Sequence, residues 1–343
     1  MHYYFLIILP ITIFFVNSII KKKKLILNYS GEKHQKFFGK NNIPLSGGIF
    51  LFFTSIFILY NNYSVFFIFL SGIFLLGFFS DINFLVSPRS RFFIQSIIVF
   101  IFVYYSKLHV GPTRIYFLDL ILNNIFLSYF FTTFCLMIVI NGSNFIDGLN
   151  GLLLGYYLMV LLIIYKLNLF TEINLELIQI NLLIGLLTCL LLFNLFNQFF
   201  MGDGGAYSLG FILSFFLISI YQNNQIISPF FVILLLWYPC FENLFSIIRK
   251  FRINKSPIKP DNKHFHQLLF LFIKKKFRLK NDYANNLGSL IIILYNLCIF
   301  TLGAINVYST QLQALLIFLS IVIYIIIYLK LLSLVSLKNN INF

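Results

Sequence analysis

The sequence predicts an all-α integral membrane protein, a polytopic bundle of about 11 transmembrane helices. Two observations carry this prediction. Of the 343 residues, 60% are hydrophobic and only 10% are charged, a composition outside the range of soluble domains. Apolar runs of roughly 15 to 22 residues also recur along the whole chain, and an α-helix needs about that length to cross a bilayer.

We expect one membrane helix from each apolar run. The first run is followed, not preceded, by Lys21 to Lys24, which is typical of a retained helix rather than a cleaved signal peptide. Because no soluble domain or low-complexity linker interrupts the series, we expect a single membrane-embedded domain over residues 1–343. The expected spans lie near 2–20, 46–60, 64–79, 92–106, 125–140, 151–166, 177–194, 205–220, 227–247, 287–305 and 312–334.

The positive charges predict the orientation of these helices. With the N-terminus outside, the loops at 21–45, 80–91 and 248–286 lie inside, and they hold 20 of the 25 Lys and Arg residues. Cytoplasmic loops of membrane proteins carry such an excess. The net charge of +15 is therefore a topology signal, and no nucleic-acid partner is needed to explain it.

The four cysteines stand singly in apolar segments and form no C-x-x-C pair. This pattern argues against a disulfide framework, a redox motif and a structural zinc site. We expect inert residues that face the core or the lipid. They are Cys135, Cys189, Cys240 and Cys298.

The segment NGSNFIDGLNGL at 141–152 combines carboxamides, a carboxylate and glycines just before a new apolar run. Asn144 and Asp147 could supply oxygen ligands to Mg²⁺, and the start of the next helix would favour an anion. Alternatively, the polar side chains only cap that helix and the glycines only let helices approach. Because capping needs one such residue and this segment has several, we favour the magnesium interpretation.

The segment MGDGGAYSLGF at 201–211 places Asp203 among glycines at the start of another apolar run. An ionisable residue at membrane depth is by default a functional-site hypothesis. Mg²⁺ typically takes one or two protein carboxylates together with substrate phosphates, so Asp147 and Asp203 would suffice. The plainer alternative is that Asp203 is only the N-cap of its helix.

The segment GFFSDINFLVSPRSRFFIQ at 77–95 ends the third span with Ser80 and Asp81, and Arg89 and Arg91 follow. A carboxylate beside two guanidinium groups at headgroup level could hold a lipid phosphate near a metal. An interfacial carboxylate with snorkelling arginines is almost as simple an interpretation.

The segment SPIKPDNKHFHQLLF at 256–270 places His264 and His266 in the most basic inside loop. Histidines can donate hydrogen bonds to a diphosphate, and Lys259 and Lys263 add positive potential. Taken alone, two histidines on a solvated loop favour an ordinary structural role. Zinc is not expected, because no further His or Cys lies at ligand spacing. All four polar clusters fall on the inside face, so we expect them to converge there.

Together the four motifs resemble a known enzyme family. In order they read G-F-F-S-D, N-x-x-N-x-x-D-G-x-N-G-L, M-G-D-G-G-A-Y-x-L-G-F and P-D-x-x-H-x-H-Q-L, within residues 28–270. This set resembles the polyprenyl-phosphate N-acetylhexosamine-1-phosphate transferases of glycosyltransferase family 4. That family includes undecaprenyl-phosphate GlcNAc-1-phosphate transferase and phospho-MurNAc-pentapeptide translocase.

The resemblance implies that a lipid-phosphate oxygen attacks the sugar-linked phosphorus of a UDP-N-acetylhexosamine, with Mg²⁺ neutralising charge on the diphosphate. UMP would leave, and a polyprenyl diphosphate sugar would remain. The implied acceptor is undecaprenyl phosphate, the donor sugar is of the GlcNAc type, and the active-site loops face the cytoplasm from a bacterial inner membrane. The product would start an O-antigen, capsule or similar cell-envelope glycan. The oligomeric state stays open, with a homodimer among the options.

The same resemblance implies roles for individual residues. Asp203 resembles the metal-binding aspartate, and Asn144 and Asp147 resemble the pair that shapes the nucleotide and metal site. Asn150 stands where many members have a second aspartate that faces the uracil. The two histidines match a motif expected to engage the phosphates of the nucleotide sugar.

Departures from the family pattern narrow the mechanism. Ser80 stands where many members have the first of two aspartates, so a covalent route through that position is closed. A general base is dispensable, because a phosphate monoester with a second pKa near 6 is already largely dianionic at neutral pH. Asp81 then remains a metal or lipid-phosphate organiser, or a weak base. Gln267 replaces a third histidine, which resembles members that act on simple amino sugars, and Glu242 keeps an acidic position.

Two other classes of function remain as alternatives. A transporter of polyprenyl lipids or solutes would keep acidic residues within opposed half-helices and would show internal repeats, whereas the polar residues here gather on one face. A non-catalytic relative would explain Ser80. Joint retention of the two aspartates and the two histidines of the other motifs argues against that relative.

Overall fold

A computed structural model describes residues 4–27, 43–60, 63–252 and 263–337. Regular structure in these ranges is helical, apart from an isolated bridge between Leu27 and Pro44. The helices are α1 (Tyr4–Lys23), α2 (Gly47–Leu59), α3 (Ser64–Asp81), α4 (Pro88–Ser106), α5 (Tyr116–Leu122), α6 (Ile125–Ile146), α7 (Leu152–Lys166), η2 (Leu169–Ile173), α8 (Leu177–Leu195), α9 (Gly202–Asn223), α10 (Pro229–Arg252), α11 (Phe265–Phe277), α12 (Asn281–Gly303) and α13 (Thr310–Leu337).

A helix lies at each of the predicted spans, with ends shifted by several residues. Seven of the described helices are long and apolar enough to cross a membrane, namely α3, α6, α8, α9, α10, α12 and α13. The prediction of a helical integral membrane protein is therefore confirmed, while the count of 11 spans stays a prediction. The four cysteines are free, as expected.

The apolar-run rule was wrong about some local structure. It gave no helix for α5, η2 or α11, because these helices are short. The last turn of α11 also holds three lysines, which interrupt the apolar run although they favour a helix C-terminus. It also placed Asn141 to Asn150 in a loop, whereas α6 continues to Ile146. The polar side chains of the first half of that segment therefore project from the last turns of α6.

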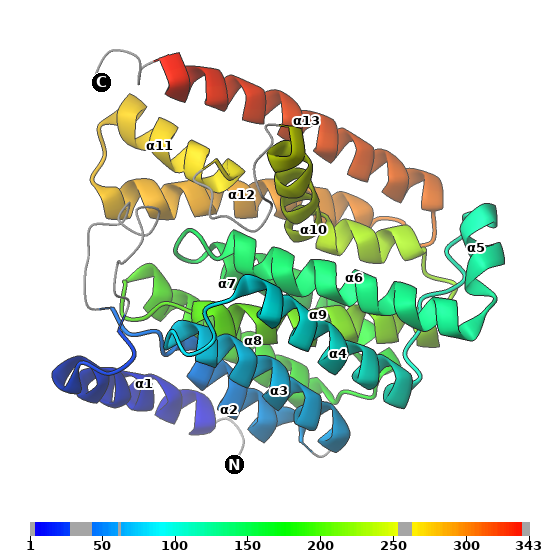
Figure 1. Ribbon diagram of the computed structural model, residues 1–343, viewed down its shortest axis with the longest axis horizontal. Helices are drawn as coiled ribbons and strands as arrows, with labels where there is room; N and C mark the ends of the chain where they lie inside the picture. Colours follow the sequence, from blue (N-terminus) through cyan, green and yellow to red (C-terminus); the bar gives the residue numbers. More distant parts are fainter. Residues whose placement is uncertain (1–3, 28–42, 61–62, 253–262, 338–343) are drawn as a thin grey trace.

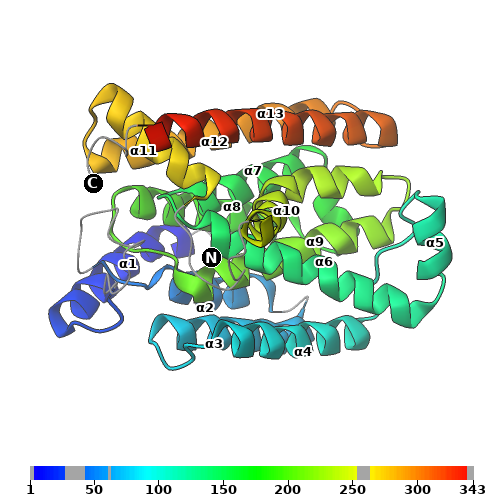
Figure 2. The same ribbon diagram turned by 45° about the horizontal axis from the view of Figure 1, so that its top comes forward.

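The helices form a layered bundle. Figure 2 shows α3 and α4 along one side, α12 and α13 along the opposite side, and α6 and α9 between them. Helix α10 contains Pro239, and Figure 1 shows its second half turning away from the direction of its first half. A proline in a helix removes a backbone hydrogen bond and clashes with the preceding turn, which accounts for the bend.

Helix α9 is the centre of the bundle, and 94% of its span is buried. It packs against α2, α3 and α6. Two of these contacts are backbone to backbone: a Cβ built on Gly48 would lie 2.4 Å from Gly205 N, and one built on Gly77 would lie 2.5 Å from Gly204 N. Small residues allow such close helix approach within a membrane.

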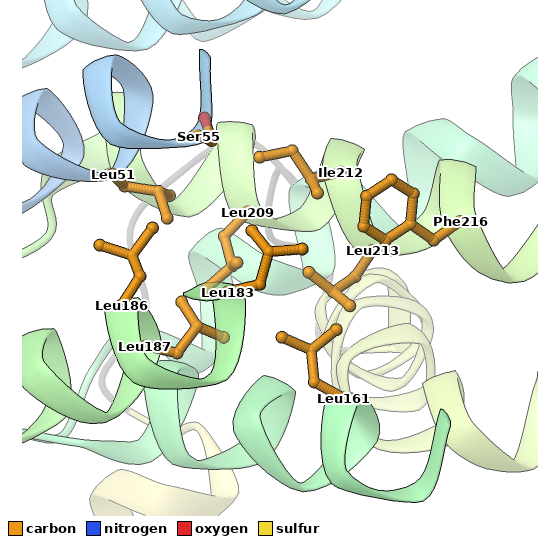
Figure 3. A pocket seen from close by; sticks show the side chains of 10 residues that line it. All are labelled: Leu51, Ser55, Leu161, Leu183, Leu186, Leu187, Leu209, Ile212, Leu213 and Phe216. Carbon is orange, nitrogen blue, oxygen red and sulfur yellow. The ribbon is translucent and has the colours of Figure 1, made fainter. Parts of the chain in front are cut away.

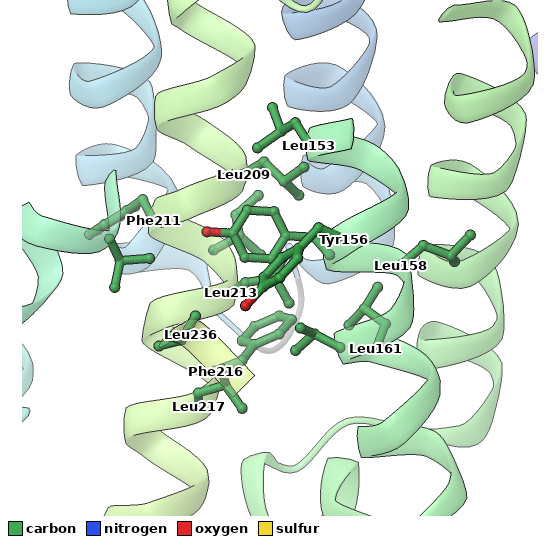
Figure 4. Packing of buried hydrophobic residues seen from close by; sticks show 14 of the residues in the cluster. Leu153, Tyr156, Leu158, Leu161, Leu209, Phe211, Leu213, Phe216, Leu217 and Leu236 are labelled. Atoms are coloured by element: carbon green, nitrogen blue, oxygen red, sulfur yellow. The ribbon is translucent and has the colours of Figure 1, made fainter. Parts of the chain in front are cut away.

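Apolar side chains cover the other face of α9. Tyr156 and Leu161 of α7 pack beside Leu213 and Phe216 of α9 (Figure 4). A small apolar void of about 10 Å³ lies between α2, α7, α8 and α9 (Figure 3). Ser55 is the polar residue beside it, and Ser55 Oγ donates to a backbone carbonyl at 2.9 Å. A space of one water with apolar walls is a packing gap rather than a substrate site.

The close approach of α3 and α9 gives a stability prediction. We expect Gly77→Ala to destabilise the protein by about 1–3 kcal/mol, because the new methyl group meets the backbone of Gly204, which has no side chain to move aside. Thermal unfolding in detergent measures this loss. Gly72→Ala on the same helix is the control, since its methyl group meets only the end of the Ile98 side chain at 3.3 Å. Equal unfolding temperatures for the two variants would contradict the prediction.

Candidate functional site

The four polar clusters meet at one end of the bundle, as the sequence predicted. Asp81 ends α3, Asp147 is the C-cap of α6, Asp203 is the second residue of α9, and His264 is the N-cap of α11. Hydrogen bonds join α3 to α9, electrostatic interactions link Asp147 to Asp81 and Asp203, and the Phe145 ring lies 5.1 Å from the His264 ring between centroids.

Asp81 organises the start of α9. Its Oδ1 accepts a hydrogen bond from Asp203 N at 2.8 Å, and its Oδ2 accepts one from Gly204 N at 3.1 Å. Gly202 makes the turn with a φ of +71°, and a Cβ there would lie 2.6 Å from Asp81 Oδ2. The carboxylate that satisfies the free amides of α9 is thus Asp81, supplied by another helix. The interpretation of Asp203 as a plain N-cap is wrong.

The Asp203 side chain points to different partners. Its Oδ2 accepts a hydrogen bond from Ser80 Oγ at 2.6 Å and forms an ion pair with Arg91 Nη1 at 2.6 Å. Arg91 Nη1 also contacts Ser80 Oγ. Arg89, the arginine that we expected to bind substrate, is exposed and takes part in no hydrogen bond or ion pair with the described residues. The arginine that pairs with Asp203 is therefore Arg91.

Asp147 is the uncompensated carboxylate of the cluster. Its side chain forms no hydrogen bond or ion pair within the described part of the chain. Burial, followed by the negative charges of Asp203 and Asp81, raises the pKa of Asp147 well above its usual value. An unpaired carboxyl group held near two others is an arrangement that a divalent cation would stabilise.

The cluster is not a complete metal cage. Among the described residues, no group of three or more His, Cys, Asp or Glu side chains is placed to hold a metal ion. Mg²⁺ usually keeps several waters and takes one or two protein carboxylates plus substrate phosphates. The donor set of Asp147 and Asp203 fits that mode of binding, and a magnesium ion here stays a prediction.

The two predicted asparagines are used differently. Asn144 Nδ2 donates to Tyr207 OH at 3.3 Å, one helical turn beyond Asp203, so it lies beside the cluster. Asn150 N donates to Asn285 Oδ1 at 2.7 Å, and Asn150 Nδ2 donates to Asn197 Oδ1 at 2.8 Å. These bonds make Asn150 an anchor between the α6–α7 turn, α12 and the segment before α9.

His264 belongs to a buried network. Its Nδ1 lies 2.9 Å from Glu242 Oε1, which also accepts from Phe265 N at 3.3 Å, and Glu242 Oε2 accepts from Tyr324 OH at 2.6 Å. Glu242 is 1% exposed and His264 is 5% exposed. The interpretation of two histidines on a solvated loop is therefore wrong. Because Nδ1 of His264 faces the carboxylate, Nε2 is the ring atom left to meet a ligand.

His266 connects the histidine segment to the α6–α7 turn. Its ring stacks on His264 with centroids 5.7 Å apart, and a Cβ on Gly148 would lie 2.1 Å from His266 Nε2. Both ring nitrogens are buried and have no hydrogen-bond partner among the described residues. Burial, opposed by Glu242 and assisted by His264, lowers the pKa of His266 to about 3. The ring is thus neutral at physiological pH and lies beside the residue that follows Asp147.

The two predicted lysines contribute less to this picture. Lys259 lies outside the described residues. Lys263 has an exposed side chain, and its backbone carbonyl accepts hydrogen bonds from Tyr328 OH at 3.1 Å and from Arg249. Helix α13 thereby holds the segment just before His264.

Sequence reasoning missed two parts of the site. The sequence-based prediction assigns substrate binding to Arg89 and not to Arg91. The available signal is the spacing of four residues from Arg91 to Gln95, which places these two polar side chains on one face of α4. Tyr324 gives almost no signal in the sequence, because tyrosine is common in this chain and the residues around Tyr324 in α13 are mostly apolar. The pair Tyr324 and Tyr328, four residues apart on one face, was the available hint.

Comparison with known proteins points to one family. Residues 63–221 match the family model described as glycosyl transferase family 4, a range that runs from α3 to α9 and contains all three clustered aspartates. The chain is 32% identical over 150 residues to a probable undecaprenyl-phosphate N-acetylglucosaminyl 1-phosphate transferase of Bacillus subtilis, covering 43% of this chain and 41% of that protein.

Two further relatives carry the name undecaprenyl-phosphate alpha-N-acetylglucosaminyl 1-phosphate transferase. The Salmonella typhi protein is 27% identical over 246 residues, which cover 66% of this chain and 65% of the relative. The Escherichia coli K12 protein is 25% identical over 270 residues, which cover 75% of this chain and 72% of the relative. The chain therefore spans between about two fifths and three quarters of these relatives.

The buried carboxylate of Glu242 gives the first prediction about the site. We expect Tyr324→Phe to lower the free energy of unfolding by about 1–3 kcal/mol, because Glu242 Oε2 loses its hydroxyl donor in a buried place. Tyr238→Phe is the matched control, since the Tyr238 hydroxyl is buried without a partner among the described residues. Thermal unfolding in detergent measures both losses. An equal loss of stability in Tyr238→Phe and Tyr324→Phe would contradict the prediction.

The neutral His266 gives a pH prediction. Its pKa is about 3 in the folded protein and about 6.5 when unfolded, so the unfolded chain binds more protons between these values. Stability should therefore fall by about 1.4 kcal/mol for each pH unit below 6.5, and His266 should have no effect above it. His266→Gln should remove this part of the slope in unfolding measurements between pH 7 and pH 5. Parallel curves for the two proteins would show that His266 does not titrate in this way.

Proposed function

We propose that the chain is a member of glycosyl transferase family 4, whose model matches residues 63–221, and that it transfers an N-acetylhexosamine 1-phosphate from a UDP-sugar to undecaprenyl phosphate. The donor sugar is of the GlcNAc type. The observation that carries the proposal is the meeting of Asp81, Asp147 and Asp203 with the buried histidine segment at one end of the bundle.

In the proposed reaction, an oxygen of the lipid phosphate forms a new bond to the phosphorus that carries the sugar. The bond from that phosphorus to the bridging oxygen of the diphosphate breaks, and UMP leaves with the electron pair. No proton has to be removed from the attacking phosphate when it is already a dianion. The enzyme's contribution is then chiefly positioning and charge stabilisation.

Asp147 and Asp203 are the residues that would hold a magnesium ion in this proposal. When bound, the ion would neutralise negative charge on the diphosphate and on the leaving UMP. Asp81 fixes the start of α9, and with it the position of the Asp203 backbone. In this arrangement Asp81 is a positioning residue, which its two backbone hydrogen bonds support more than the role of base.

The polar residues around the carboxylates have proposed roles in substrate binding. His264, held by Glu242, offers Nε2 to a phosphate oxygen, and the neutral His266 lies beside the turn that carries Asp147. Asn144 lies next to the same carboxylates through Tyr207. The exposed side chains of Arg89 and Lys263 would attract anionic substrates at longer range.

We further propose that the chain acts as one membrane-embedded domain in a bacterial inner membrane, with the site on the cytoplasmic face. The distribution of Lys and Arg supports that orientation. A cytoplasmic site meets UDP-sugars where they are made, and the product would start a lipid-linked cell-envelope glycan.

UMP release tests this proposal. We expect purified protein in detergent to release UMP only when undecaprenyl phosphate, Mg²⁺ and a UDP-N-acetylhexosamine are all present. Asp203→Asn should lower the rate by at least about 100-fold, because the proposed cation loses a charged ligand. The variant should still insert and elute as the wild type does.

Two outcomes would contradict the proposal. Metal-independent turnover by Asp203→Asn would exclude the role given to Asp203. Absence of UMP release with every UDP-sugar, where a known relative is active, would favour a non-catalytic protein with Ser80 as the departure responsible. Ser80→Asp in that inactive protein would then be the variant to assay for restored release.

A further inference from the structure

Arg91 pairs with Asp203, the carboxylate that the proposed function assigns to a cation. Arg91 Nη1 lies 2.6 Å from Asp203 Oδ2, and the two side chains are 19% and 26% exposed. Ser80 Oγ donates to the same oxygen at 2.6 Å. Partial burial limits screening of this pair by water, so the guanidinium balances a large part of the Asp203 charge.

The Arg91 guanidinium has a hydrogen-bond donor that no described residue accepts from. Its Nε is buried and has no hydrogen-bond partner among the described residues, and one turn further along α4 Gln95 Nε2 is in the same condition. A buried donor without an acceptor raises the free energy of the folded protein, and a ligand or a water molecule is the partner that would satisfy it. A phosphate oxygen is the acceptor that a guanidinium and a neighbouring amide suit best.

We propose that Arg91 is an exchangeable counter-ion of Asp203. Before a divalent cation binds, Arg91 neutralises the carboxylate; a cation that takes Asp203 repels the guanidinium and releases it to pair with a substrate phosphate. The inference rests on the proposed function, because it takes Asp203 as the cation ligand. Cation binding and phosphate binding then favour each other through one side chain, and this coupling must be reciprocal.

Binding of Mn²⁺ alone, without any substrate, tests the first half of the inference. We expect Arg91→Gln to lower the Mn²⁺ Kd by about 10-fold in titrations followed by electron paramagnetic resonance, because the competing charge is gone. Arg91→Lys keeps a positive charge, so its Kd should stay near that of the wild type. A Kd that is unchanged or raised in Arg91→Gln would overturn the inference.

Arg89→Gln is the matched control for charge. It removes the same charge from the same turn of α4, but its exposed side chain makes no contact with Asp203 among the described groups. We expect its Mn²⁺ Kd to change by less than about twofold, since solvent and salt screen an exposed charge. An equal gain in affinity in both variants would mean that general charge, not displacement of Arg91, sets the Mn²⁺ affinity.

The second half is tested by coupling between Mn²⁺ and phosphate ligands. The Kd values of a short-chain polyprenyl phosphate and of UMP are measured with and without Mn²⁺. We expect Mn²⁺ to tighten one of these ligands in the wild type and the gain to fall about 10-fold in Arg91→Gln. The ligand affected identifies whether the acceptor or the donor supplies the phosphate. Equal gains in wild type and variant for both ligands would overturn the release of Arg91.

The same measurements separate this inference from the proposed function. If the wild type releases UMP and Asp203→Asn loses Mn²⁺ binding, but Arg91→Gln binds Mn²⁺ as the wild type does, the function stands and counter-ion exchange is wrong. If the wild type binds no Mn²⁺, the role of Asp203 as a cation ligand fails, and the inference fails with it.

Discussion

The pair of hydrogen bonds from the start of α9 to the Asp81 carboxylate is the interaction on which the site depends. It joins the end of α3 to the beginning of α9, the most buried of the candidate membrane spans. A helix start presents free amides and the positive end of the helix dipole, so a carboxylate there is stabilised by both. Gly202 leaves room for that carboxylate, and Gly204 lets the backbone of α3 come close. The Asp203 side chain is thereby free to face Ser80 and Arg91 instead of capping its own helix.

Glu242 plays the corresponding part for the histidines. It lies three residues beyond Pro239, where α10 has bent, and its two oxygens are satisfied by donors from α11 and α13. A buried carboxylate is tolerated only when such donors surround it. The result is that His264 and the stacked His266 are held against the turn that carries Asp147. Two carboxylates, Asp81 at the start of α9 and Glu242 at the start of α11, therefore set the geometry of the polar end.

Much of this fold could be predicted from the sequence, because a lipid environment forces each long apolar run to satisfy its own backbone as a helix. Convergence of the motifs also followed, since the orientation of the spans brings them to one face. What could not be predicted was which side chains pair. Asp81, not Asp203, caps α9, and Arg91, not Arg89, pairs with Asp203. Both pairings depend on the glycine contacts that set how closely α9 lies against α3. Tyr324, far along the chain, becomes a partner of Glu242 only through the packing of α13.

Charge balance explains how the site can exist with Ser80 at the end of α3. Asp81 is compensated by backbone amides and Asp203 by Arg91, which leaves Asp147 as the carboxylate of the cluster without a partner among the described residues. A fourth carboxylate, at position 80, would add repulsion next to Asp203, whereas the serine hydroxyl donates a hydrogen bond to it. Serine therefore lowers the electrostatic cost of bringing three carboxyl groups together when no cation is bound. The same substitution leaves fewer negative charges to attract a cation, so substrate phosphates must supply a larger share of its ligands.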